Sequence, residues 1–191
     1  KMSEHPSQND SQELINNLQN GRFNEAEILA RSLTKNSPND QLGWKVLGVL
    51  FSRSHRYRQA LIANQKSTEI EPLDPEAHTN LGLTLQHLDQ LEEAKVNYRT
   101  ALDLEPRFFA AHNHLGEALN MSDHFDEAVA SFRKAIELNP DYAQAHYNLG
   151  ISFQKLNRLE EAEASYRQAI AIKFDHVEAH SNLGLVLYSN G

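Results

Sequence analysis

The hydrophobic and small residues of the chain follow a pattern that repeats every 34 residues. A segment ending in Leu-Gly recurs as WKVLG, HTNLG, HNHLG, HYNLG and HSNLG, at residues 44–48, 78–82, 112–116, 146–150 and 180–184. A second segment, in which an apolar residue is followed by two polar residues and alanine, recurs at 23–26, 91–94, 125–128 and 159–162. Proline stands in the same register at 38, 72, 106 and 140. Self-similarity at a fixed period of this size predicts a stack of identical helical or strand units.

The residue types at fixed places in each repeat predict two antiparallel helices joined by a tight turn. A glycine in the middle of a helix costs about 1 kcal/mol relative to alanine, so the Leu-Gly glycines indicate a second helix too close to admit a side chain. The alanine of the second segment fits that contact, and rings at Tyr98, Phe132 and Tyr166 would fill the space one turn later. Proline ends the second helix because it lacks an N–H. Residue types that enter the left-handed conformation easily stand at the turns: Gly21, His55, Asp89, Asp123 and Asn157.

The predicted helices are paired along the chain. They comprise residues 11–20 with 24–35, 41–53 with 57–70, 75–87 with 91–104, 109–121 with 125–138, 143–155 with 159–172, and a last helix at 177–189.

This arrangement resembles the tetratricopeptide (TPR) family, whose repeat is 34 residues long and carries the Leu-Gly pair, the alanine and the proline at these places. The resemblance implies an all-α fold, a right-handed superhelical α-solenoid of antiparallel helix pairs. With Leu-Gly at positions seven and eight of each repeat, the repeats run 7–40, 41–74, 75–108, 109–142 and 143–176. Residues 177–191 would be the first helix of a truncated sixth repeat, and residues 1–6 a tag remnant or disordered tail.

Two repeats depart from the family pattern. In the first, Asp10, Glu13 and Leu14 replace the expected Trp, Leu and Gly, which suits the cap of a solenoid. Asp10 with Glu13 also predicts a capping box at the start of a helix. In the second, Asn64 and Ser67 replace an aromatic residue and an alanine, which predicts looser packing there.

Composition and charge exclude several classes of partner. The chain has 26 acidic and 18 basic side chains, a formal net charge of −8, whereas a nucleic acid or an anionic membrane requires a clustered basic surface. No window approaches 18 consecutive apolar residues, so no membrane span is expected. Without an apolar segment near the N-terminus a signal peptide is not expected, and the protein is predicted to be cytoplasmic. The absence of cysteine excludes disulfides and thiolate metal sites.

The chain carries no catalytic motif of a known type, and we expect neither enzyme activity nor a cofactor. The recurring histidines could suggest a metal site, but they stand at position four of successive repeats, on helices about 8–10 Å apart. Zinc requires its ligands within about 2 Å of one centre. The second repeat has Trp44 at this position, which favours a packing role. These histidines are His78, His112, His146 and His180.

The resemblance implies a binding surface, because in this family positions two, five, six, nine, twelve and thirteen of the first helices face a concave groove. Position six holds Asn80, His114, Asn148 and Asn182, and Val46 in the second repeat. This resembles the asparagine ladder in the TPR superhelix of O-linked N-acetylglucosamine transferases, whose amides hold the backbone of an extended peptide. An amide can donate to and accept from a peptide unit. Alternatively, asparagine here is a solvent-facing consensus residue. The other predicted groove residues are Lys45, Arg53, Gln86, His87, Tyr147 and Lys155.

A second family mode, the clamp that binds the C-terminal carboxylate of chaperones, is only partly matched. Lys45 and Asn80 occupy two of its positions, but Ala110 and His114 stand where basic residues are required. We therefore do not expect this mode.

The sequence predicts a protein–protein interaction scaffold that binds an extended peptide or protein segment in its groove. One alternative is the N-terminal, substrate-recruiting segment of a larger bacterial enzyme such as a glycosyl-, sulfo- or methyltransferase. Another is a self-assembly module, a homodimer joined through the C-terminal end where Leu183 and Leu187 lack a covering helix. The identity of the partner is not determined by the sequence.

Overall fold

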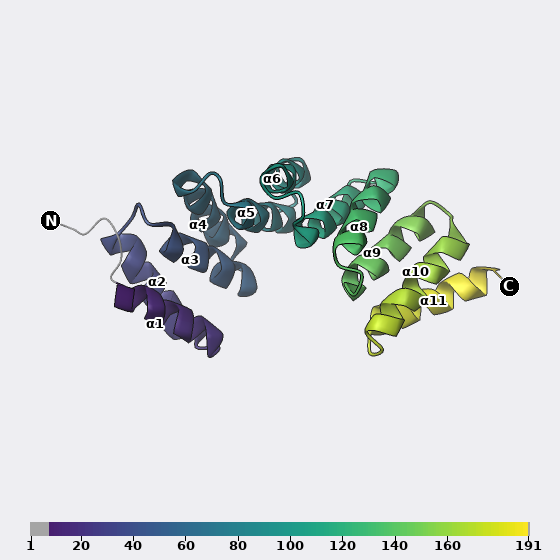
Figure 1. The fold of residues 1–191 in the computed structure, drawn as a ribbon, viewed down its shortest axis with the longest axis horizontal. Helices are drawn as coiled ribbons and strands as arrows, with labels where there is room; N and C mark the ends of the chain where they lie inside the picture. Colours follow the sequence, from purple (N-terminus) through teal and green to yellow (C-terminus); the bar gives the residue numbers. More distant parts are fainter. Residues whose placement is uncertain (1–7, 191) are drawn as a thin grey trace. The chain divides into compact units, whose positions relative to one another are not determined.

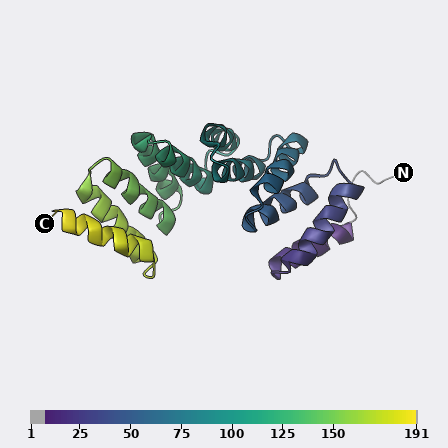
Figure 2. The ribbon, with the colours of Figure 1, turned by 180° about the vertical axis from the view of Figure 1, so that it is seen from behind.

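The computed structural model describes residues 8–190, and in this part of the chain eleven helices follow one another with short connections. Within the units, paired helices such as α3 with α4 and α9 with α10 lie antiparallel and side by side, as Figure 1 and, from behind, Figure 2 show. The predicted tail, residues 1–6, lies outside the described residues. None of the helices between residues 8 and 190 is long and apolar enough to cross a membrane. The helices are α1 Gln8–Gln19, α2 Phe23–Asn36, α3 Gln41–Arg53, α4 Tyr57–Ile70, α5 Pro75–His87, α6 Leu91–Leu104, α7 Phe109–Met121, α8 Phe125–Leu138, α9 Ala143–Lys155, α10 Leu159–Ile172 and α11 Val177–Asn190.

The helix ends confirm the predicted pairs. From α3 to α10 every boundary falls on the predicted residue, whereas α2 is one residue longer than predicted at both ends and α11 at its C-terminal end. The prediction was wrong at α1, which already runs from Gln8. Asp10 therefore lies inside the helix, where it cannot act as the N-cap of a capping box.

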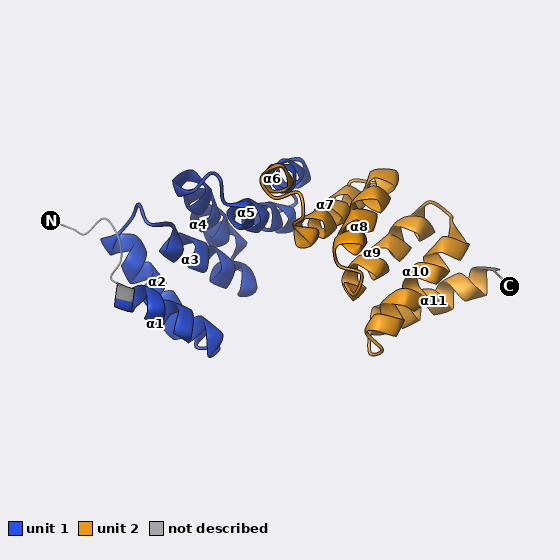
Figure 3. Ribbon diagram, viewed as in Figure 1, with its two compact units in different colours: residues 1–100 blue, residues 101–191 orange. Residues whose placement is uncertain are grey.

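The chain forms two compact units, residues 1–100 and 101–191 (Figure 3). The described part of the first unit contains α1 to α5 and most of α6, and the second contains the end of α6 and α7 to α11. In each unit the odd-numbered helices are the first helices of the repeats and the even-numbered helices the second. Buried residues stand on both the first and the second helices, and include Leu47 and Ala60 in the first unit and Leu149 and Ala162 in the second.

Glycine and an aromatic ring meet inside the helix pairs, where the prediction placed the alanine of the second helix against the glycine and the ring beside it. A Cβ atom added to Gly116 on α7 would lie 2.6 Å from Cε1 of Phe132 on α8, and one added to Gly150 would lie 2.6 Å from Cε1 of Tyr166. Both rings are fully buried. Gly184 on α11 differs, because no heavy atom of the described chain lies within 4 Å of its added Cβ. The corresponding side of α11 is therefore uncovered by residues 8–190.

The turns between paired helices adopt the predicted left-handed conformation. The φ angle is between 57° and 61° at the four non-glycine positions and 70° at Gly21. A second helix begins two residues after each of these positions, so the register of the helix pair is fixed by local backbone geometry. The four positions are His55, Asp89, Asp123 and Asn157.

The recurring histidines have a structural explanation. The side chain at position four bonds the backbone carbonyl six residues earlier, which ties the start of a first helix to the connection before it. A carbonyl oxygen only accepts, so Nε2 of each histidine carries the proton; Trp44 donates from Nε1 to Pro38 O in the same way, at 3.0 Å. The histidine bonds are His78 to Pro72 O, 2.9 Å, His112 to Pro106 O, 3.0 Å, His146 to Pro140 O, 2.9 Å, and His180 to Phe174 O, 2.8 Å.

The second repeat is closely packed but polar at the place where looser packing was expected. Asn64 is 1% exposed, and its Nδ2 donates to Thr84 Oγ1 at 2.9 Å and to Asn80 O at 3.2 Å. Its Oδ1 and the hydroxyl of buried Ser67 have no hydrogen-bond partner among the described residues. Asn64 and Ser67 therefore leave buried polar atoms without hydrogen-bond partners among the described residues, but they do not loosen the packing of this repeat.

Candidate functional site

The first helices of neighbouring repeats lie against each other and offer one exposed side in each unit. We call this side the first-helix face: α3 and α5 in the first unit, and α7, α9 and α11 in the second. Polar contacts join neighbouring first helices at equivalent positions. In the first unit Ser52 Oγ lies 3.2 Å from Thr84 Oγ1, and in the second Ser152 Oγ donates to Asn120 Oδ1 at 2.9 Å.

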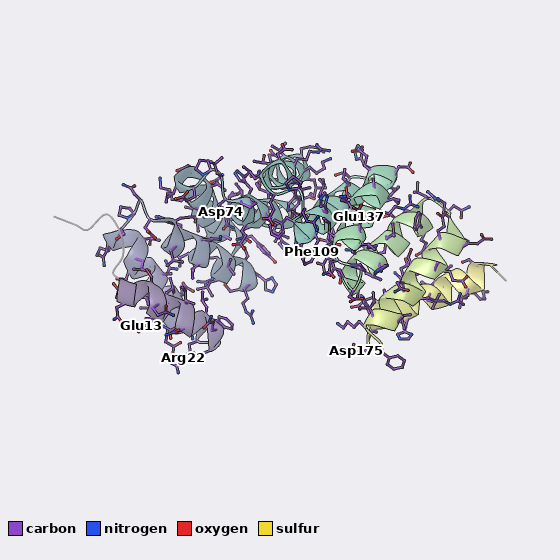
Figure 4. All side chains as sticks on the ribbon, viewed as in Figure 1. Glu13, Arg22, Asp74, Phe109, Glu137 and Asp175 are labelled. Atoms are coloured by element: carbon purple, nitrogen blue, oxygen red, sulfur yellow. The ribbon has the colours of Figure 1, made fainter. Side chains whose placement is uncertain are left out.

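Lys45, predicted to face the groove, is already paired within the first unit. Its Nζ lies 2.9 Å from Oδ2 of Asp74 and also contacts Glu76. Asp74, labelled in Figure 4, caps α5 by accepting from two backbone N–H groups of its first turn and also accepts from Gln41 Nε2 at 2.7 Å. Burial acts to raise the pKa of the Asp74 carboxyl, but the bonds from Lys45 and Gln41 outweigh it and hold the pKa below its usual value. A ligand carboxylate would have to compete with Asp74 for Lys45.

The remaining predicted residues of the first unit lie along α3 and α5. Arg53 ends α3, and its guanidinium stands over the ring of Phe23 at 4.2 Å. His87 ends α5 and stacks on Tyr57 with ring centroids 4.5 Å apart. The guanidinium of Arg53 and the aromatic ring of His87 therefore both stand at the C-terminal ends of neighbouring first helices.

Gln86 and Asn80, also on α5, differ in their availability. Gln86 accepts from the hydroxyl of Tyr98 at 2.9 Å and so belongs to the contact between α5 and α6. The side-chain amide of half-buried Asn80 makes no hydrogen bond to another described residue. Among the asparagines of the predicted ladder, Asn80 is thus the one whose side-chain amide is not bonded to another described residue.

In the second unit the predicted residues His114 and Asn148 come together on Glu117, a residue that we did not predict. Nδ2 of Asn148 donates to Glu117 Oε1 at 2.8 Å and to Asn113 Oδ1 at 3.2 Å. Nδ1 of His114 donates to Glu117 Oε2 at 3.1 Å, since a carboxylate only accepts. Asn148 is 6% exposed. Its amide N–H groups are therefore used between α7 and α9.

Asn182 on α11 approaches two tyrosine hydroxyls. Its Nδ2 lies 3.4 Å from the hydroxyl of Tyr147 and 3.5 Å from that of Tyr166, at the long limit for a hydrogen bond. Burial raises the pKa of Tyr166 to about 12, so this hydroxyl keeps its proton. Tyr147 is half-buried and also packs on His176, with centroids 4.7 Å apart. Lys155, the last residue of α9, is exposed.

Two asparagines of the predicted ladder, Asn148 and Asn182, share one relationship to the first helix before them. Asn148 bonds Asn113, and Asn182 lies near the hydroxyl of Tyr147. In each case the residue at position six approaches the residue at position five of the preceding first helix. Position six therefore serves contacts between first helices in the second unit, whereas in the first unit Asn80 has no such bond.

Position nine of the first helices carries apolar side chains that the prediction left out. Val49 is 45% exposed and Leu185 57%, and Leu83 and Ile151 are partly exposed. Glu117 is the exception at this position. The 34-residue spacing of these residues was readable in the sequence, and an exposed apolar residue repeated at one position is a signal of a contact surface.

The described residues contain no group of three or more His, Asp or Glu side chains arranged to hold a metal ion. The arrangement on the first-helix faces, half-exposed apolar side chains beside amides, fits non-covalent recognition of a chain segment.

Comparison with known proteins agrees with this fold. Two models of repeat families match: one described as TPR repeat matches residues 124–157 and 153–191, and one described as tetratricopeptide repeat matches residues 63–96. No curated protein sequence matches the chain.

Solved structures resemble most of the chain. TTC0263, a thermophilic TPR protein of Thermus thermophilus, is 20% identical with a TM-score of 0.76, covering 96% of this chain and 100% of its own. YrrB, described as a TPR protein with an unusual peptide-binding site, is 20% identical with a TM-score of 0.75, covering 93% of this chain and 91% of its own. The first TPR region of Spaghetti, solved with an HSP90 peptide, is 21% identical with a TM-score of 0.60, covering 61% of this chain and 92% of its own. At these identities the likeness establishes the fold.

Proposed function

Because the chain belongs to the tetratricopeptide-repeat family, we propose that this interaction module is a scaffold whose first-helix faces bind an extended segment of another protein. Two of the structural relatives are described as having a peptide-binding site or a bound peptide, which supports the proposal. Binding requires no cofactor and no chemical step.

The observation that carries the proposal is the pairing of exposed apolar side chains with an open amide on the same face. In the first unit Val49 and Leu83 stand at position nine of α3 and α5, and Asn80 stands one turn before Leu83. An extended segment presents backbone amides between side chains of alternating direction. The apolar residues would bury its side chains, and the amide of Asn80 would bond its backbone.

The magnitude expected of these contacts is modest. A hydrogen bond from Asn80 is worth about 0.5–1.5 kcal/mol net. Burying a ligand side chain against Val49 and Leu83 contributes about 25 cal/mol for each Å² of apolar surface removed from water. Several contacts in series are therefore needed, which suits a repeat array.

The proposal is tested with a peptide selected on the protein itself. Twelve-residue random peptides would be displayed against the full chain, and the strongest binder would be titrated by fluorescence anisotropy. Val49→Glu places a charge on the first-helix face and is expected to weaken binding by about tenfold or more. Ile62→Glu is the matched control, since Ile62 is 65% exposed on the second helix α4 of the same unit. Asn80→Ala should weaken binding roughly two- to tenfold.

The outcome decides where the ligand lies. Equal loss from Val49→Glu and Ile62→Glu, or loss from the Ile62 variant alone, contradicts the first-helix face as the binding surface. Failure to select any peptide contradicts the proposed function itself.

A second candidate function is self-association through α11. The side of α11 that carries Gly184 corresponds to the side of α9 that packs on α10, and residues 8–190 leave it uncovered. Leu185 and Leu187 are 57% and 43% exposed on this helix. Light scattering over a range of concentrations tests this candidate: a mass that rises towards a dimer and is restored to the monomer by Leu187→Lys supports it, and a constant monomer mass rejects it.

A further inference from the structure

Glu117 interrupts the apolar row on the first-helix face of the second unit. It occupies position nine of α7, where α9 has Ile151 and α11 has Leu185. The side chain is 27% exposed, so it is neither a solvated surface residue nor a closed core residue. A carboxylate at this place changes the chemistry of the face.

The carboxylate is held in one orientation by three hydrogen bonds. Oε1 accepts from Asn113 Nδ2 at 3.0 Å and from Asn148 Nδ2 at 2.8 Å, and Oε2 accepts from His114 Nδ1 at 3.1 Å. A carboxylate has about four acceptor positions. One position, on Oε2, is therefore left for a further donor.

Glu117 carries a negative charge that no lysine or arginine within residues 8–190 balances. Burial acts to raise the pKa of the Glu117 carboxyl, but the bonds from His114 and the two amides outweigh it and lower the pKa, so the group is ionised at neutral pH. Among residues 8–190 no lysine or arginine forms an ion pair with it.

Other half-buried carboxylates of the chain are paired differently. Glu27 contacts the guanidinium groups of Arg31 and Arg56, and Asp74 contacts Lys45. Each of these carboxylates therefore has a lysine or arginine partner from the protein itself. Glu117 therefore has the geometry to bind a cation, and no lysine or arginine within residues 8–190 occupies this place.

We propose that Glu117 binds a lysine or arginine side chain of the peptide held on the first-helix face of the second unit, which rests on the proposed function and adds its ligand class. Ile151 and Leu185 stand at the equivalent positions on the next two first helices, so apolar residues of the ligand follow the cationic one. Because two amides already occupy Oε1, a guanidinium cannot bind both oxygens, and lysine and arginine serve about equally well.

The bond from Asn148 of α9 to Glu117 of α7 also has a purely structural reading. In that case Glu117 stabilises the contact of α7 with α9 and has no effect on which peptide binds. The two roles differ in a readout that folding does not affect: the preference of the protein among peptides that differ at one residue.

The test uses peptide libraries as the probe. Five nine-residue libraries, random except for a central lysine, arginine, citrulline, norleucine or glutamate, would be titrated against the full chain by fluorescence anisotropy. Citrulline has the shape of arginine without its charge. Wild type should bind the lysine and arginine libraries roughly ten- to a hundredfold more tightly than the citrulline library. Glu117→Gln should remove this preference, while Glu160→Gln, which removes one exposed charge from the second helix α10, should leave it unchanged.

The outcomes are distinguishable. If all libraries bind without a preference for lysine or arginine, the inference is overturned and the proposed function stands. The same holds if the wild type shows this preference and Glu117→Gln keeps it. Binding of no library overturns the proposed function and the inference together. If Glu117→Gln does not fold, a wild type without a preference for lysine or arginine still overturns the inference, since that measurement needs no variant.

Discussion

Gly116→Ala tests the packing that defines each helix pair. The new Cβ would lie 2.6, 2.7 and 2.9 Å from Cε1, Cζ and Cδ1 of Phe132, a fully buried ring. Carbon atoms in contact prefer about 3.5–4.0 Å, so the ring or the helix must move by about 1 Å. Overpacking of this kind costs about 1–3 kcal/mol. The gain in helix propensity is about 1 kcal/mol, which leaves a net destabilisation of about 0–2 kcal/mol.

Gly184→Ala is the matched control, because this glycine stands at the same position of its repeat and its added Cβ meets no described atom within 4 Å. The control gains the same helix propensity without the clash and should be stabilising by about 1 kcal/mol. The difference between the two variants isolates the overpacking cost of about 1–3 kcal/mol.

The assay must resolve local stability, because a repeat array unfolds in parts. Urea unfolding followed by far-ultraviolet circular dichroism gives the overall effect, and amide hydrogen exchange gives the opening free energy of α7 and α11 separately. If Gly116→Ala stabilises α7 as much as Gly184→Ala stabilises α11, the ring does not exclude a side chain and the reasoning is refuted.

Three further variants test other parts of the account. Ser67→Ala removes a buried hydroxyl without a partner among the described residues and should raise the free energy of unfolding by about 1 kcal/mol in urea; a loss of stability contradicts the assignment. His146→Trp should keep the bond to the carbonyl six residues earlier, as Trp44 does, whereas His146→Phe should lose about 1 kcal/mol; equal stability of the two variants speaks against this bond. Glu27, whose bond from Arg56 lowers the pKa of the carboxyl from 4.5 to about 2, stabilises the fold above pH 4.5 and loses this effect as the pH falls towards 2. Glu27→Gln should therefore remove on the order of 1 kcal/mol of the pH dependence in this window, measured by urea unfolding at several pH values, and an unchanged pH profile counts against the pairing.

Much of the fold could be predicted because each helix boundary is set by a local rule. The left-handed turn residue, the Leu-Gly pair and the proline act within a few residues of the boundary that they fix. At α1 the same rules failed, since Asp10 resembles an N-cap in sequence but lies within the first turn of the helix. A terminal helix has a neighbour on one side only, so tertiary packing constrains its start less than that of an internal helix.

The site was predicted less completely because its chemistry depends on residues about one repeat apart. Asn148 and Glu117 are 31 positions apart in the chain, and their bond forms only because α7 and α9 lie side by side. A ladder of identical residues suggested identical roles, but Asn80 is open while Asn148 is committed to Glu117. Reading position nine across the repeats would have found Glu117, as the single charged residue in an apolar row.

Amide hydrogen exchange of the full chain, with and without a selected peptide, tests the central claim most directly. The account predicts slower exchange in first helices, α3 and α5 or α7, α9 and α11, with the second helices α4, α8 and α10 unchanged. Protection confined to the second helices, with the first helices unaffected, would contradict it.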